Sequence, residues 1–169
     1  ALVSTHDYLK ATNYYVTALQ AHADDISLRH DLATLFMKLK KHGNATKVLT
    51  YVLQPAGSLP ETSKMSNEVQ SLLLLAEVHA RAAKGVAIAD VPDAKHAVVS
   101  FLLKARDLQR LILKNVNSIM ETPEVVNEQK RVMVKICCEL ANCYLEEDKP
   151  GDKALDAYQD ALKADNVNL

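Results

Sequence analysis

A spaced set of small and bulky residues recurs along this 169-residue chain and constrains its fold more than any other feature. Ala11 is followed at four residues by Tyr15 and at seven by Ala18. The same offsets begin again 34 residues later at Ala45, and once more near the end at Ala154. Spacings of three and four place side chains on one face of an α-helix. The recurrence therefore predicts repeated helical units.

A second pattern precedes most of these sets. It consists of Leu, a small residue and, three positions further on, an aromatic or imidazole ring: Leu32, Ala33 and Phe36; Leu75, Ala76 and His79; Leu140, Ala141 and Tyr144. In this order the two patterns match helix A and helix B of a tetratricopeptide repeat. We therefore predict an all-α fold, a tetratricopeptide-type α-solenoid of antiparallel helix hairpins with about three and a half to four repeats.

The spacing has a physical reason. Small residues let two antiparallel helices approach closely, and rings and Leu side chains one turn away fill the space between hairpins. We expect the following residues to pack the repeats: Leu2, Ala11, Tyr15, Ala18, Leu32, Ala33, Phe36, Ala45, Leu49, Leu75, Ala76, His79, Ala97, Phe101, Leu140, Ala141, Tyr144, Ala154, Tyr158 and Ala161. The pattern weakens after Ala97, because Lys104 occupies the next small position and Ala105 follows it.

The helices fall into a single array over residues 1–169. We expect helix pairs at about 1–21, 27–54, 66–118 and 124–164. Prolines and glycine predict a loop at Pro55–Pro60 and an irregular insertion from Gly85 to Asp93, before an unusually long helix from about Ala94 to Val116. Counting back from Ala11 places Leu2 in a helix A, and a further helix A should begin just before Leu169. We expect a fragment of a longer solenoid.

Charge and composition argue against several classes of protein. The 20 basic and 21 acidic side chains give a net charge of −1, and the densest basic run is Lys38–Lys41, so we expect no nucleic-acid partner. Apolar runs such as Leu72–Ala76 are far shorter than the roughly 20 residues that span a bilayer, so we expect no direct membrane insertion. The three cysteines, an odd number, predict reduced thiols.

The sequence carries no motif of enzymatic chemistry. It lacks a glycine-rich phosphate loop, G-x-S-x-G and H-E-x-x-H, and its histidines share no spacing typical of metal ligands. We therefore predict a non-enzymatic protein with no catalytic residue, no cofactor, no metal and no small-molecule substrate. Cys137 and His79 occupy packing positions, which favours a structural role for both.

Stacked hairpins form a groove lined by their A helices, and solenoids bind partners in such grooves. The exposed face of helix A predicts four groove-facing residues: His30, Thr34, Glu77 and Asn142. These residues do not suit the cationic clamp with which some co-chaperones hold acidic peptides. The sequence leaves open whether a peptide or a neighbouring repeat fills the groove.

Four segments resemble a particular family: the front from Ala1 to Tyr15, the long helix Lys104–Val116, and the stretches Glu128–Lys130 and Ile136–Ala141 that follow it. In this order the chain resembles the central part of the tetratricopeptide repeat protein 21 family, the large repeat subunit of intraflagellar transport complex A. The resemblance implies a structural role in retrograde ciliary transport and in the entry of cargo into the cilium. It implies tetratricopeptide and β-propeller subunits as partners, and the cytoplasm, the cilium or flagellum and its base as location.

The alternative is a free-standing peptide-binding adaptor or co-chaperone module of the same fold. Such a module should have polar capping helices at its ends and a charged groove. The sequence shows neither feature, so we favour the subunit of a larger complex.

Overall fold

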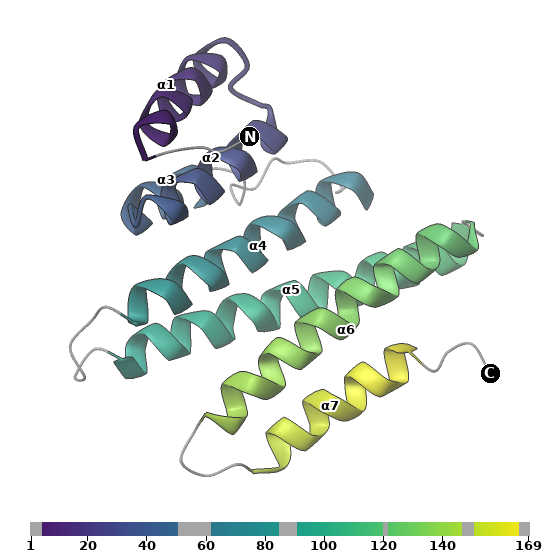
Figure 1. The fold of residues 1–169 in the computed structure, drawn as a ribbon. Coiled ribbons are helices and arrows are strands. Elements are labelled where there is room, and N and C mark those ends of the chain that lie inside the picture. The colour runs from purple at the N-terminus through teal and green to yellow at the C-terminus, as the bar shows by residue number, and fades with distance from the viewer. Residues whose placement is uncertain (1–4, 51–61, 85–90, 120–121, 147–150, 166–169) are drawn as a thin grey trace.

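The computed structural model describes residues 5–50, 62–84, 91–119, 122–146 and 151–165, which are α-helical apart from short stretches at the helix ends. The seven helices of the described part are α1 (Thr5–Ala21), α2 (Ile26–Lys38), α3 (His42–Thr50), α4 (Thr62–Ala83), α5 (Val91–Ile119), α6 (Pro123–Leu145) and α7 (Asp152–Asp165). Successive helices alternate in direction and stack into a staircase (Figure 1). The predicted all-α solenoid of antiparallel hairpins is confirmed.

Neighbouring helices of the chain pack against each other. The α2–α3, α4–α5 and α6–α7 pairs each pack along their lengths, and α1 lies on α2 at one end of the stack. Contacts of α3 with α4 and of α5 with α6 join one hairpin to the next. The order of helices in space therefore follows their order in the chain.

One hydrophobic cluster runs through α4, α5, α6 and α7. Its buried members are Met65, Val69, Leu72, Ala76, Val98, Leu102, Ala105, Ile112, Val116, Ile136, Leu140, Ala141 and Ala157. Ala105 and Ala141 have no exposed surface, which marks the places where backbones approach closely. Because the cluster crosses hairpin boundaries, these hairpins share one core.

A second cluster joins α2 and α3 to α4. Ala33 and Ala45, one on each helix of the α2–α3 hairpin, are completely buried in it. Leu75 of α4 belongs to this cluster, and Phe101 of α5 packs against both this cluster and the larger one. The Phe101 ring also lies 5.3 Å from the ring of His79, centroid to centroid. His79 therefore packs against the ring of Phe101.

The expected packing residues take three kinds of position. Leu32, Ala33, Phe36, Ala45, Leu49, Leu75, Ala76, Leu140, Ala141, Ala154 and Ala161 are buried. Ala11, Tyr15, Ala18, His79, Ala97, Phe101 and Tyr144 are half-buried. Tyr158 is 37% exposed, beside the exposed Leu155 and Leu162 of α7. Leu2 lies outside the described residues.

The structure corrects the packing position on the long helix. Ala97 was expected to be a packing residue where the repeat pattern weakens; it is half-buried, whereas Ala105 is completely buried. The side chains that accompany Ala105 in the core are Val98 and Leu102, at spacings of seven and three residues. The buried stripe of α5 is thus offset by one residue from the repeat pattern, as Lys104 requires.

Two helix starts also differ from expectation. Helix α4 begins at Thr62 rather than at residue 66, and α5 begins at Val91 rather than near Ala94. The expected insertion therefore extends too far along the chain. Pro92 lies in the first turn of α5, where its missing N–H costs no helical hydrogen bond. Residues 85–90 of that insertion and the loop Pro55–Pro60 lie outside the described residues.

Helix α2 ends at Lys38 because of its capping geometry. The N–H of Lys40 donates to the Met37 carbonyl at 3.0 Å, and the N–H of Lys41 donates to the Phe36 carbonyl at 2.8 Å. Lys40 has a φ of 58°, in the left-handed region. This pair of bonds is the Schellman ending, in which the left-handed position usually holds glycine. Lys40 thus terminates the helix in a conformation that a side chain disfavours.

Replacing Ala105 by Leu should lower the free energy of unfolding by about 1–3 kcal/mol, because the close approach at this residue leaves no room for an added side chain. Ala97→Leu is the matched control, since it makes the same change on the same helix at a half-buried position. We expect the control to change stability by less than about 0.5 kcal/mol. Urea unfolding followed by circular dichroism measures both. Equal losses would contradict the assigned register.

Replacing Lys40 by Gly should raise the free energy of unfolding by roughly 1 kcal/mol, because glycine adopts a positive φ without the steric cost that a Cβ imposes. The neighbouring Lys41→Gly substitution serves as control, since Lys41 has no positive φ and gains nothing from glycine. The melting temperature of Lys40→Gly should rise, and that of Lys41→Gly should fall. A lower melting temperature for Lys40→Gly would contradict this account of the helix end.

Candidate interaction groove between α4 and α6

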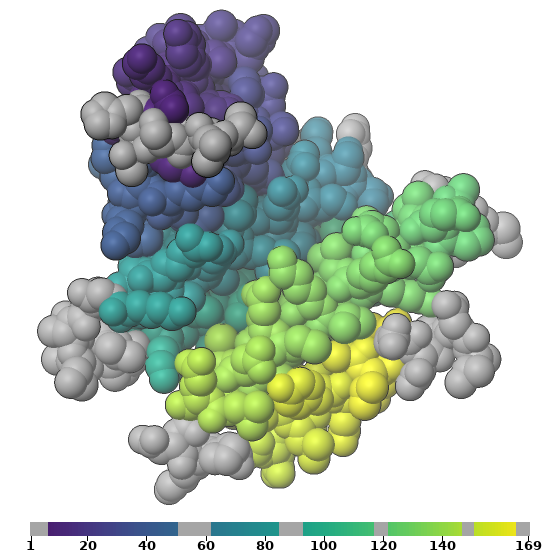
Figure 2. Space-filling model, viewed as in Figure 1, coloured from purple at the N-terminus to yellow at the C-terminus, as the bar shows by residue number. Residues whose placement is uncertain are grey.

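A groove of about 500 Å³ runs between α4 and α6, the A helices of two successive hairpins. Both helices pack on α5, which supplies Val98 and Leu102 to the groove. The lining from α4 is Gln70, Leu73, Leu74, Ala76, Glu77 and Ala80, and the lining from α6 is Lys135, Glu139, Asn142 and Cys143. We call this hollow the A-helix groove. Both helices reach the surface on the face shown in Figure 2.

Helical periodicity places the lining residues on facing sides. Gln70, Leu74 and Glu77 of α4 are separated by four and three residues, so they form one stripe along that helix. Lys135, Glu139 and Asn142 of α6 have the same separations. Apolar carbons form the floor and polar groups form the walls. This combination suits a partner that buries apolar side chains and fixes its register with polar contacts.

Two carboxylates influence each other across the A-helix groove. Glu77 pairs with Arg81 one turn along α4, at 2.5 Å. The Glu139 carboxylate lies 4.0 Å from the Lys135 ammonium. Burial raises the pKa of Glu139, Lys135 lowers it, and the negative charge of Glu77 on the facing helix raises it. The two walls therefore carry like charges that repel, although each carboxylate has a basic neighbour on its own helix.

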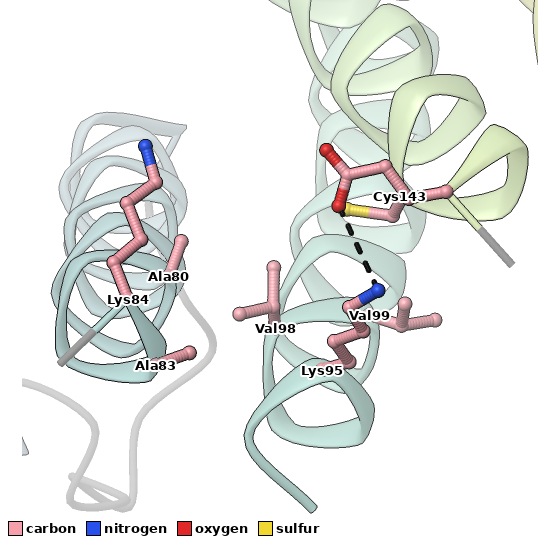
Figure 3. A pocket seen from close by; sticks show the side chains of 8 residues that line it. Ala80, Ala83, Lys84, Lys95, Val98, Val99 and Cys143 are labelled. Atoms are coloured by element: carbon pink, nitrogen blue, oxygen red, sulfur yellow. Dashed lines mark ion pairs between the residues drawn. The ribbon is translucent and has the colours of Figure 1, made fainter. Parts of the chain in front are cut away.

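A second hollow of about 320 Å³ continues the groove towards the hairpin ends. It shares Ala80, Val98 and Cys143 with the A-helix groove. Figure 3 shows Ala80, Ala83 and Lys84 on one side and Lys95, Val98 and Val99 on the other, with Cys143 above. The Lys95 ammonium lies 3.9 Å from a Glu146 carboxylate oxygen, so an ion pair borders this hollow.

Of the four residues that were expected to face the groove, only two line it in the structure. Glu77 and Asn142 line the A-helix groove, and the side-chain Oδ1 of Asn142 accepts a hydrogen bond from the Tyr158 hydroxyl of α7 at 3.2 Å. Thr34 is half-buried, and its hydroxyl donates to the His30 carbonyl of its own helix at 2.9 Å. His30 is buried, so its assignment to an open groove was wrong. Direct contact between α2 and α4 covers it.

His30 belongs to a buried polar pair between α2 and α4. Its Nε2 lies 2.6 Å from the Ser71 hydroxyl oxygen, and that hydroxyl donates to the Asn67 carbonyl at 3.0 Å. Because the hydroxyl has one proton to donate, Nε2–H of His30 is the donor in the first bond. Burial lowers the pKa of His30, and the nearby Asp31 charge opposes that effect. The pair joins successive A helices through the neutral imidazole.

Sequence reasoning missed Gln70, Lys135 and Glu139 as groove residues. The signal that would have found them is helical spacing, because Gln70 precedes Glu77 by seven residues and Lys135 precedes Asn142 by seven. Cys143 also lines the groove. Cys137 is buried, as its packing position predicted, and burial together with the Asp160 charge raises its pKa. Its thiol is thereby held in the protonated, unreactive form.

The part of the chain that the structure describes contains neither a metal-binding group nor a membrane-spanning helix. Within the described ranges, no group of three or more His, Cys, Asp or Glu side chains could hold a metal ion. None of the helices described here combines the length and the apolar character needed to cross a bilayer.

The His30–Ser71 pair should make stability depend on pH. The unfolded chain takes up a proton at the imidazole near pH 6.5, whereas the folded chain resists protonation because the pKa of His30 is lowered. Unfolding free energy should therefore fall as the pH drops below 6.5. His30→Gln, measured by urea unfolding between neutral and mildly acidic pH, should show a smaller fall. Replacement of the exposed His96 by Gln serves as control, and an unchanged slope in His30→Gln would contradict this origin.

Comparison with known proteins identifies the family. Residues 1–162 match the family described as the fourth ARM domain of tetratricopeptide repeat protein 21. Human tetratricopeptide repeat protein 21A is 38% identical over 162 residues, and the mouse 21B protein is 35% identical over 162 residues. These alignments cover 96% of this chain and 11% of each relative. ARM and tetratricopeptide arrays are both α-solenoids, and the long α5 departs from the regular tetratricopeptide hairpin.

A solved structure gives a weaker likeness. The crystal structure of MamA is 15% identical, and the likeness covers 95% of this chain and 90% of that one with a TM-score of 0.41, too low to support a conclusion. The family model and the sequence identities carry the assignment. The chain belongs to the tetratricopeptide repeat protein 21 family.

Proposed function

We propose that this chain is a section of a structural subunit of intraflagellar transport complex A that acts in retrograde ciliary transport and in ciliary cargo entry. The observation that carries the proposal is membership of the tetratricopeptide repeat protein 21 family over residues 1–162. The chain spans 11% of the length of the human relative. The role of the whole protein is therefore part of the proposal.

At the coarser level the chain is a protein-interaction scaffold, as its family and its helical repeats indicate. The A-helix groove supports binding of another protein, because it combines an apolar floor with polar walls. The proposed partners are the other subunits of the complex, which are tetratricopeptide and β-propeller proteins. Chemical turnover has no part in this role.

The proposed location is the cytoplasm at the base of the cilium or flagellum and the interior of that organelle. A subunit that acts both in cargo entry and in retrograde transport would occupy both places. Observation of the protein in motion therefore tests the role as well as the location.

Purification of the tagged full-length parent protein from ciliated cells tests the proposal. We expect a stoichiometric set of β-propeller and tetratricopeptide subunits by mass spectrometry, and fluorescence that moves along cilia from tip to base. Recovery of chaperones or of one soluble client would favour the adaptor alternative, and the repeat fold would stand.

A pair of charge reversals tests the A-helix groove within the same experiment. Lys135→Glu places an acidic group on the groove wall, whereas Arg131→Glu makes the same change one turn earlier on α6, outside the groove lining. Both side chains are largely exposed, at 66% and 80%. Lys135→Glu should lower recovery of a direct partner roughly three- to tenfold, and Arg131→Glu should leave it unchanged. Equal recovery with both variants would exclude the groove as the binding surface.

A further inference from the structure

A basic hollow lies at the ends of three helices, beside the hollow that continues the A-helix groove. It measures about 670 Å³ and is lined by Met37, Lys38, Lys40, His42, Arg81, Ala82 and Lys84. The lining comes from the end of α2, the start of α3 and the end of α4. In Figure 2 this corner is where the blue atoms of α2 and α3 meet the teal atoms of α4. We propose that the basic hollow binds an acidic segment of a partner protein.

The concentration of charge is unusual for this chain. The sequence as a whole is balanced, with a net charge of −1, yet four Lys and Arg side chains and His42 line one hollow, and no acidic residue is among its lining in the described part of the chain. The fold creates this concentration, because it brings Arg81 and Lys84 to the Lys38–Lys40 run from about 40 residues away in the sequence. An electropositive concavity attracts acidic groups more strongly than scattered charges do.

Two of the basic side chains that line the hollow have a structural role in their own helices. Basic residues in the last turn of a helix stabilise its negative end, and Lys38 and Arg81 are so placed. Arg81 is also paired with Glu77. Lys40 follows the end of α2, and within the described residues Lys40 and Lys84 form no ion pair. Two cations thus remain for a ligand.

His42 provides a separate indication of a missing partner. Its Nδ1 atom is buried from water, and it makes no hydrogen bond to any of the residues that the structure describes. Buried polar atoms are normally bonded, and an orphaned one requires an explanation. A turn of the imidazole towards the hollow would bring a ring N–H to the oxygen of a bound carboxylate. The imidazole would then contribute a directed bond beside the lysine charges.

The shape of the site favours a peptide over other anionic partners. The basic groups surround a concave hollow with apolar contributions from Met37 and Ala82, which admits protruding side chains. A flat bilayer surface cannot enter such a hollow, and the basic residues form no stripe along which a nucleic-acid backbone could run. Lys84 also lines the hollow of Figure 3, which continues the A-helix groove. A partner seated in that groove could therefore extend an acidic segment into the basic hollow.

Fluorescence anisotropy with the purified chain tests this inference, using a fluorescein-labelled peptide of alternating Glu and Leu. The test variant combines Lys40→Gly with Lys84→Gln, because the first substitution relieves a strained φ and should not unfold the protein. The control combines Lys64→Gln with Lys114→Gln, which removes the same charge at the far ends of α4 and α5. We expect the test variant to bind at least about fivefold more weakly and the control to match the parent chain. Affinity should also fall as salt rises.

Several results would overturn the inference. These are no measurable binding of the Glu–Leu peptide, equal binding of a Gln–Leu peptide, or equal losses in the test and control variants. Binding to phosphatidylserine–phosphatidylcholine vesicles that the test variant abolishes, without peptide binding, would assign the hollow to a lipid headgroup instead. None of these results bears on the ciliary role, because the assay uses neither the complex nor cilia.

Discussion

Close approach of neighbouring helices at small residues is the constraint on which the rest of this structure depends. Ala33 and Ala45 have no exposed surface in one hairpin, and Ala105 and Ala141 have none in the next two. At these residues the backbones come close enough for flanking Leu, Ile and Val side chains to interdigitate. The resulting core crosses hairpin boundaries, so each hairpin relies on its neighbours for burial, as expected of a solenoid.

The same stacking creates the candidate binding surfaces. Because α4 and α6 both pack on α5, their outer faces form the walls of the A-helix groove. The ends of α2, α3 and α4 meet at one side of the stack and form the basic hollow. One surface is mixed in polarity and the other is cationic. A scaffold with two such adjacent surfaces can recognise a partner at two points, which increases specificity without any chemistry.

Polar contacts between helices fix the register in which the helices pack around the apolar core. The side-chain amide of Gln109, which is 1% exposed, donates to the Gln129 carbonyl at 3.0 Å and to its side-chain oxygen at 2.8 Å, and so joins α5 to α6. Arg110 of α5 pairs with Asp160 of α7 at 2.7 Å. The His30–Ser71 bond joins α2 to α4. Buried polar groups of this kind penalise any sliding that would leave them unpaired.

The sequence by itself determined the class of fold and the family, because local spacing indicates which helix face is buried. It placed Ala33, Ala45 and Ala141 correctly in the core, and it placed Glu77 and Asn142 on the same groove face. Only the tertiary structure decided that His30 is buried and that Lys40, Arg81 and Lys84 share one hollow. These features depend on contacts between residues about 40 positions apart. The periodicity of one helix carries no information about the neighbour that will cover it.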